Sequence, residues 1–279
     1  VRLRPQSVTR RPVKTRGEKI FVALNLAAML FFLLAPLGVL VLQSLVTPQG
    51  IGFANYTALN ANPRGSALFI APTDAIRNSL LFASVTVAFA VALGLLAAYA
   101  IVRTRKGGGA LDALFLLPLA TSAVTLGFGY IVAFSQPPFD FRAAVWLIPV
   151  AHTLIALPLV IRAVLPLLRE IKPNIQEAAA MLGASPARVF REIDLPIVAR
   201  AVLIGAVFAF TLSLGEFGAT TLLARSEWTT MPLAIYRLLG QPGLGNYGQA
   251  LALSVLLMLV SAVAIALMER VRVGDAGEF

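Results

Sequence analysis

The sequence predicts an all-α membrane protein that crosses the bilayer six times. Hydrophobic residues make up 58% of the 279 residues and charged residues only 13%, whereas a soluble domain carries about 25% charged residues. The apolar residues gather in runs of the length that spans a bilayer as an α-helix, about 20 residues. Lysine and arginine are unevenly distributed between the segments that connect these runs, and this bias predicts on which side of the membrane each segment lies.

Residues 20–270 are expected to form one six-helix membrane domain. Prolines inside several runs are compatible with this assignment, because neighbouring helices can satisfy the backbone groups that a proline frees. The expected spans are 20–45, 78–102, 111–134, 145–168, 197–223 and 250–268.

Residues 1–19 are expected to form a disordered basic tail. They carry seven lysines and arginines against one acidic residue, with prolines and polar residues between them. Charges placed next to a membrane span suit the anionic lipid of the cytoplasmic leaflet. The net charge of +10 is therefore assigned to membrane lipid, and no nucleic-acid partner is expected.

Lysine and arginine also predict the orientation. The tail, the 103–110 loop, the 169–196 loop and the C-terminal tail together hold 16 of these residues, and the segments on the opposite side hold five. Because the more basic loops stay in the cytoplasm, both termini and the loop at 171–196 are expected to be cytoplasmic.

The sequence contains no recognisable catalytic or cofactor site. Cysteine is absent and His152 is the only histidine, which leaves no ligand set for a metal site. No glycine is followed by lysine, so the phosphate-binding loop of an ATPase is absent. The chain is therefore expected not to be an enzyme and to need no cofactor, and any ATP hydrolysis would belong to a partner. His152 itself is interpreted as a packing residue.

The loop at 171–196 is a polar island between two apolar runs. Asn174 is expected to cap a short helix, with Glu177 reaching back to its backbone in a capping box. Gly183 suits the left-handed position that ends a helix, and Ser185-Pro186 would start a second short helix. The proposed contact residues of this loop are Glu177, Ala178, Ala179, Gly183, Ile193, Leu195 and Pro196.

The fifth span holds a carboxylate, Glu216, deep in an apolar run. Ionisable residues inside spans usually face a bundle interior or an aqueous path. Two interpretations remain open: Glu216, with Ser213 and Gly215, lines a translocation path, or Glu216 is hydrogen-bonded to a neighbouring helix and purely structural. Gly205, Ala209 and Ser213 form a small-residue stripe that allows close helix packing.

The spacing of Glu177-Ala178-Ala179, Gly183, Ile193 and Leu195-Pro196 resembles the cytoplasmic coupling loop of binding-protein-dependent ABC importer permeases. Three further stretches are similar to the same permeases, and the Thr229–Tyr236 stretch points to their thiamine and iron(III) branch. The three stretches are Asn78-Ser79-Leu80, Leu116–Ala120 and Leu214–Ala219.

The resemblance implies a type I importer fold in a bacterial inner membrane, with a coupling helix between spans four and five. It implies three protein partners: an ABC ATPase subunit, an extracytoplasmic solute-binding protein and a second permease subunit, identical or sister. It favours thiamine or iron(III) as the solute over molybdate or sulfate. The competing hypothesis is an ATP-independent secondary transporter or channel, for which a docking loop would have no use.

Overall fold

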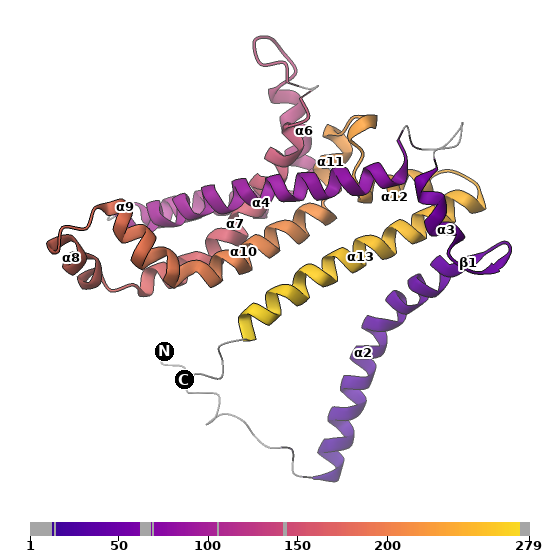
Figure 1. Cartoon of the computed structure of the whole chain (residues 1–279), viewed down its shortest axis with the longest axis horizontal. Helices are drawn as coiled ribbons and strands as arrows, with labels where there is room; N and C mark the ends of the chain where they lie inside the picture. The colour runs from indigo at the N-terminus through magenta and orange to yellow at the C-terminus, as the bar shows by residue number, and fades with distance from the viewer. Residues whose placement is uncertain are drawn as a thin grey trace.

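The computed structural model describes residues 13, 15–61, 68, 70–104, 106–141 and 144–273. Within them five helices are long and apolar enough to cross a membrane, or six if one bent pair counts as a single span. Figure 1 shows four of the long helices running side by side, with α2 diverging from them. The five are α2 (Arg16–Leu45), α4 (Pro72–Arg103), α7 (Leu147–Glu170), α10 (Leu195–Gly215) and α13 (Leu244–Val273).

Shorter elements connect the long helices, with α8 and α9 at one end of the bundle, α3 and α12 at the other, and α6 projecting from its side (Figure 1). They are the antiparallel pair β1 (Val46–Thr47) and β2 (Gly50–Ile51), α3 (Ala54–Thr57), η1 (Ala58–Asn60), α5 (Gly108–Leu116), η2 (Leu117–Ala120), α6 (Ala123–Ala133), α8 (Pro173–Met181), α9 (Pro186–Val189), the π-helical turn η3 (Phe190–Asp194), α11 (Gly218–Leu223), η4 (Ser226–Trp228) and α12 (Met231–Leu239).

Helix α7 lies at the centre of the bundle, packed against α4 and α10. Glycines bring the three helices close together. A Cβ atom on Gly94 of α4 would lie 2.7 Å from Val160 Cγ1, and one on Gly205 of α10 would lie 3.1 Å from Val160 Cα. The small-residue stripe of the fifth span therefore packs closely, as expected, and Ala209 and Ser213 are both buried.

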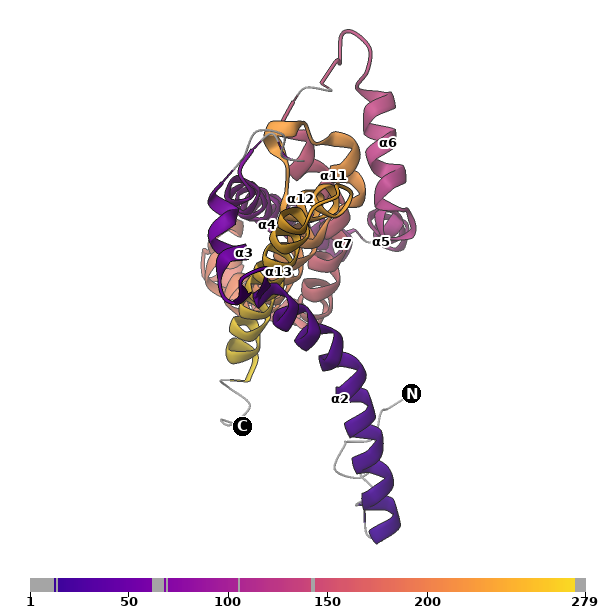
Figure 2. The same ribbon diagram turned by 90° about the vertical axis from the view of Figure 1, so that its right-hand side faces the viewer.

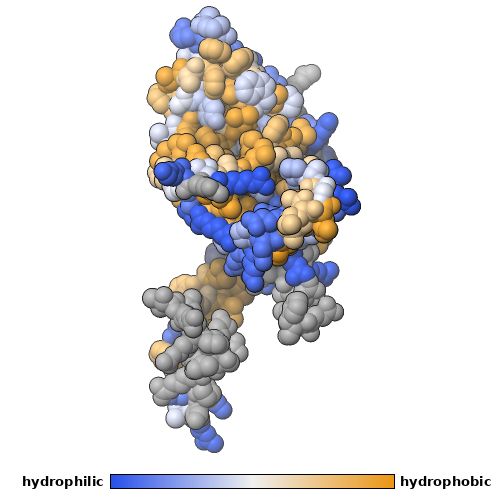
Figure 3. All heavy atoms as spheres, turned by 90° about the vertical axis from the view of Figure 1, so that its left-hand side faces the viewer, coloured by the Kyte–Doolittle hydropathy of each residue, from blue (hydrophilic) through white to orange (hydrophobic). Residues whose placement is uncertain are grey.

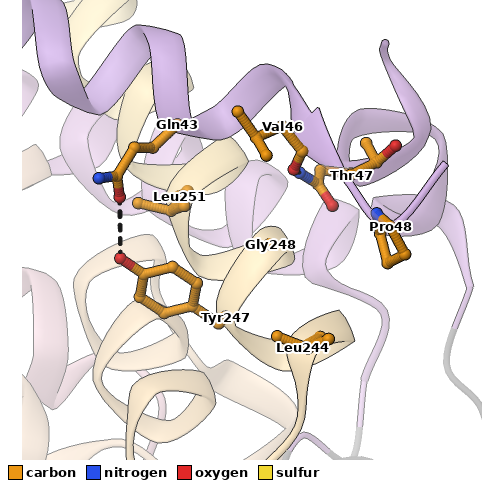
Figure 4. Close-up of a pocket in the computed structure, with 9 residues that line it drawn as sticks. Gln43, Val46, Thr47, Pro48, Leu244, Tyr247, Gly248 and Leu251 are labelled. Carbon is orange, nitrogen blue, oxygen red and sulfur yellow. Dashed lines mark hydrogen bonds between the residues drawn. The ribbon is translucent and has the colours of Figure 1, made fainter. Parts of the chain in front are cut away.

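Among the described residues, helix α2 packs against other elements near its C-terminal end (Figure 2). None of its most apolar 18-residue window is buried, and Figure 2 shows it leading away from the bundle. At the attached end α2 contacts α13, and residues of both helices line an open pocket of about 450 Å³. Figure 4 shows Tyr247 donating a 3.0 Å hydrogen bond across this junction to Gln43 Oε1.

The structure corrects the start of the first span. Thr15 and Glu18 form a capping box, in which each side chain bonds the other residue's backbone N–H. Helix α2 therefore begins at Arg16, and residues 16–19, expected to belong to the tail, are helical. The rest of the expected tail, residues 1–12 and 14, lies outside the described residues.

The expected third span, 111–134, is not one straight helix. Its two halves, Gly108–Ala120 and Ala123–Ala133, meet at an angle of 100°. Pro118 lies in the 3₁₀ turn before the bend, where its missing N–H weakens the helical hydrogen bonding. Figures 1 and 2 show α6 standing out from the bundle.

Helix α6 is held against α11 by one of the two glycines in its sequence. A Cβ atom on Gly127 would lie 2.9 Å from Ala219 Cα, whereas nothing lies within 4 Å of the position on Gly129. Gly127 therefore permits a backbone-to-backbone approach, and Gly129 has open space beside it.

The fifth span also ends earlier than expected. Helix α10 stops at Gly215, Glu216 is extended with ψ 125°, and α11 restarts at Gly218. The expected span 197–223 is thus a helix, a break and a second short helix. The sixth span is longer than expected, since α13 begins at Leu244 rather than near residue 250.

Candidate functional site

The polar loop forms a short exposed helix, α8, at one end of the bundle. Gly183 ends it with φ +85°, the left-handed conformation expected for this glycine. The Gly183 N–H donates to Ala180 O at 2.9 Å and the Ala184 N–H to Ala179 O at 3.0 Å. These two bonds are the Schellman arrangement, which satisfies carbonyls at a helix end.

The start of α8 differs from the expected capping box. The helix begins at Pro173, and the N-cap position belongs to Lys172, whose side chain makes no capping bond. Asn174 is therefore inside the first turn. Proline is favoured at a first helical position because its missing N–H would have no intrahelical partner there. The Glu177 side chain is consequently not used as a cap and stays exposed.

The second half of the loop runs without interruption into the membrane. Ser185 caps α9 by accepting from the Arg188 N–H at 3.4 Å, as expected. The expected second short helix does start at Pro186, as α9, but it is not separate, because the chain is one continuous helix from Pro186 to Gly215.

The contact residues expected in the loop share one end of the molecule but differ in exposure. Figure 3 looks onto this end and shows hydrophilic residues gathered over it. The hydrophobic tip of α8 is also open, with Met181 91% and Leu182 89% exposed. Glu177, Ala178, Gly183 and Pro196 are exposed, and Ala179, Ile193 and Leu195 are half-buried.

Two residues of this region were not singled out from the sequence. Gln176 Nε2 donates a 2.8 Å hydrogen bond to Asp194 Oδ1, and Asp194 is fully buried. A buried carboxylate has no periodic signature in a single sequence. The only available signal was an acidic residue immediately before Leu195-Pro196.

At the other end of α10, Glu216 lies in a buried polar cluster. Its carboxylate accepts from the Ala219 N–H at 2.7 Å and from the Thr220 N–H at 3.0 Å, which caps α11. His152 Nε2 of α7 is 3.1 Å from Glu216 Oε2, and His152 Nδ1 is 2.7 Å from Ser213 Oγ. The cluster therefore joins α7, α10 and α11, and its histidine packs as interpreted.

The sequence stretches Asn78-Ser79-Leu80 and Thr229–Tyr236 contact each other. Asn78 Nδ2 donates to Glu227 O at 3.0 Å and to Thr229 O at 3.1 Å. Ser79 Oγ accepts from the Met231 N–H at 2.8 Å. These bonds fasten the start of α12 to α4, so both stretches have a structural role at the end of the bundle opposite α8.

Comparison with known proteins agrees with this arrangement. Residues 90–272 match the family described as binding-protein-dependent transport system inner membrane component. The chain belongs to this family.

Individual relatives extend the match to nearly the whole chain. The 2-aminoethylphosphonate transport system permease protein PhnV of Salmonella typhimurium is 31% identical over 92% of this chain and 95% of its own. The sulfate transport system permease protein CysT of the same organism is 34% identical over 77% and 78%. A bacterial alginate ABC transporter, solved in complex with alginate pentasaccharide-bound periplasmic protein, shares the fold with a TM-score of 0.69, 19% identity and coverage of 91% and 93%.

The family resolves the choice between transporter classes. The chain is a multi-pass inner-membrane permease subunit of binding-protein-dependent transport, and not an ATP-independent transporter. An ATPase subunit and a solute-binding protein are the partners that such a permease implies. The expected thiamine or iron(III) specificity is not supported, because the relatives described here are named for a phosphonate and for sulfate.

Proposed function

We propose that this chain forms one half of a solute path and receives the work of a separate ATPase subunit through α8. The observation that carries the proposal is the exposed helix α8, ended by Gly183 and followed by a single helix that runs from Pro186 into the membrane. A short rigid helix joined to a membrane span can transmit a displacement of the ATPase subunit to that span. Because only differential affinity shifts a conformational equilibrium, the ATPase must contact α8 differently with and without ATP.

Co-purification tests this coupling surface. Glu177→Ala removes an exposed charge, and Gly183→Ala places a side chain at φ +85°, where L-residues are strained. We expect both variants to lose most of the ATPase subunit that the wild type retains. Glu192→Ala is the matched control, because Glu192 is also exposed on this loop and pairs only with Arg188 among the described ion pairs. Full retention in both test variants would contradict the docking role.

The orientation proposed for the chain places α8 and both termini in the cytoplasm. The C-terminal end of α4, the α8–α9 turn and the C-terminal end of α13 point toward the same side of Figure 1, as the lysine and arginine distribution requires. The exposed apolar surface of α2 would be covered by lipid and by the second permease subunit, identical or sister.

We further propose a small oxyanion, a phosphonate or sulfate, as the solute class. The support is the pair of relatives named for such solutes. Calorimetric titration of the cognate binding protein with 2-aminoethylphosphonate, sulfate, molybdate, thiamine and Fe(III) tests it. Binding of one of the oxyanions alone is expected, and selective binding of thiamine or Fe(III) would overturn the proposal.

The path role of Glu216, Ser213 and Gly215 stays a prediction. Gly215 is exposed, so it can border an aqueous path directly. Glu216 and Ser213 are only 7% and 4% exposed, and their polar atoms are engaged in the cluster around His152. Their contribution to the path would therefore be to fix the position of the α10–α11 break.

A further inference from the structure

The link between α8 and the membrane bundle rests on very few buried atoms. None of the nine residues of α8, all of them described, is buried. Among the described elements it packs mainly against the even shorter α9. The 2.8 Å bond from Gln176 Nε2 to Asp194 Oδ1 ties α8 to the turn from which α10 starts.

Asp194 also faces a second helix. Tyr99 of α4 is close enough to Asp194 for the two groups to interact electrostatically, but neither the Tyr99 hydroxyl nor Asp194 Oδ2 makes a hydrogen bond among the described residues. The Tyr99 ring packs edge-on against Phe190 at 5.4 Å between centroids, and the Arg103 guanidinium lies 5.8 Å from the same ring centroid. One fully buried carboxylate therefore stands between α8, α4 and the start of α10.

The backbone explains how Asp194 reaches this position. Pro196 lies inside the continuous helix, where its ring would collide with the carbonyl four residues earlier. The helix widens into the π turn Phe190–Asp194, in which the Leu195 N–H donates to Phe190 O. A π turn inserts an extra residue and shifts the side chains around it, and such turns recur at functional sites. Phe190 and Asp194 consequently both face α4.

We propose that Asp194 is a positioning residue that locks α8 to α4 and α10, so that a displacement of α8 is carried into the membrane helices. The proposal rests on the coupling role of α8 proposed above. Loss of the carboxylate would leave α8 attached through the α9 turn but free to tilt. ATPase docking would survive, whereas transmission between the two faces of the membrane would not.

The lock is tested first in the purified permease without ATPase. The chain has no cysteine, so Met181→Cys and Lys106→Cys place spin labels on α8 and on the exposed α4–α5 turn. Labelled chain is diluted into unlabelled chain, so that only distances within one copy are read. A hydrogen bond to a charged group contributes enough that its loss should raise the detached population about tenfold or more, seen as a broadened distance distribution in Asp194→Leu.

Asp194→Asn is the conservative variant, because its amide oxygen can accept from Gln176 and its amide N–H can donate to Tyr99. We expect it to keep the narrow distribution. Gln176→Leu removes the hydrogen bond between Gln176 and Asp194 from the α8 side. It replaces Asp194→Leu as the test variant if Asp194→Leu fails to fold. A narrow distribution in both leucine variants would overturn the lock.

The second measurement uses the assembled transporter in lipid discs, with phosphate release as the readout. Stimulation of ATP hydrolysis by the binding protein requires a mechanical link from the outer face to the inner face. We expect Asp194→Leu to retain the ATPase subunit and lose this stimulation, and Asp194→Asn to keep both. Full stimulation in Asp194→Leu would overturn transmission through Asp194. Whether Glu177→Ala loses or retains the ATPase subunit tests only the docking of the ATPase on α8. The distance measurement in the permease without ATPase tests the Asp194 lock independently of that result.

Discussion

His152 is the residue on which the buried cluster around the α10–α11 break depends. Its two ring nitrogens reach Ser213 Oγ at 2.7 Å, Thr220 Oγ1 at 2.8 Å and Glu216 Oε2 at 3.1 Å. With an exposed fraction of only 1%, it cannot exchange these partners for water. The imidazole therefore gives the buried Glu216 carboxylate a partner from another helix.

Two substitutions in this cluster separate a structural role from a path role. His152→Leu should lower the free energy of unfolding of the purified chain by on the order of 3 kcal/mol, since it removes a buried hydrogen-bond partner of Ser213, Thr220 and Glu216 at once. Glu216→Gln keeps the size of the side chain and part of the α11 cap, so it should destabilise less. Thermal unfolding in detergent gives the stabilities, with Ser84→Ala as the control because Ser84 is exposed and bonds only within its own helix.

Uptake by Glu216→Gln then decides the path role. Reduced uptake with normal assembly would support a role of Glu216 in the path. Wild-type uptake would remove Glu216 from the path and leave the structural role alone.

At the scale of elements, the contact between α6 and α11 determines how the two broken spans meet. Both helices follow breaks in apolar runs, at Thr121-Ser122 and at Glu216-Phe217. Gly127 allows the α6 backbone to approach Ala219, and Gly218 allows the α11 backbone to approach Val124. These two glycines therefore permit a direct contact between α6 and α11.

Gly127→Ala should separate α6 from α11, because the new Cβ would lie 2.9 Å from a backbone atom that cannot rotate away. Overpacking of this kind costs about 1–3 kcal/mol, measurable as a lower unfolding temperature. Gly129→Ala provides the matched control in the same helix, with open space around the added methyl group. Equal stability of the two variants would show that α6 does not pack on α11 in this way.

At the scale of the whole molecule, the predicted orientation can be read with cysteines, since the natural chain has none. Lys106 and Gln241 are exposed at opposite ends of the bundle. In intact cells a membrane-impermeant maleimide should label Gln241→Cys and leave Lys106→Cys unlabelled until the membrane is permeabilised. The reverse pattern would place α8 outside the cell and remove the basis of the coupling proposal.

Much of the molecule could be predicted from local sequence. Long apolar runs dictate helices in a bilayer, where every backbone group must be satisfied within the segment. Gly183 was predictable because few other residues adopt a left-handed helix end, and Ser185-Pro186 because serine and proline suit the first helical positions. The family followed from spacing across the 177–196 loop.

The breaks in the third and fifth spans could not be predicted in the same way. The bend after Pro118 and the stop at Gly215 lie within runs whose average hydropathy stays high on both sides, so hydropathy does not register them. The stop at Gly215 is stabilised by contacts from elsewhere in the chain, above all from His152 on α7. Asp194 was missed for the same reason, because its partners Gln176 and Tyr99 are brought to it only by folding.

The sequence by itself determined that this is a multi-span membrane chain with a glycine-ended polar loop between its fourth and fifth spans, because hydrophobic length and glycine and proline geometry act over neighbouring residues. The resemblance of that loop to ABC importer permeases indicated the class of protein. Only the tertiary structure decided where spans break, that Glu216 is buried as a helix cap, and that Asp194 joins α8 to the bundle. Those outcomes depend on which polar groups meet across helices, since burying a polar group without a hydrogen bond costs free energy.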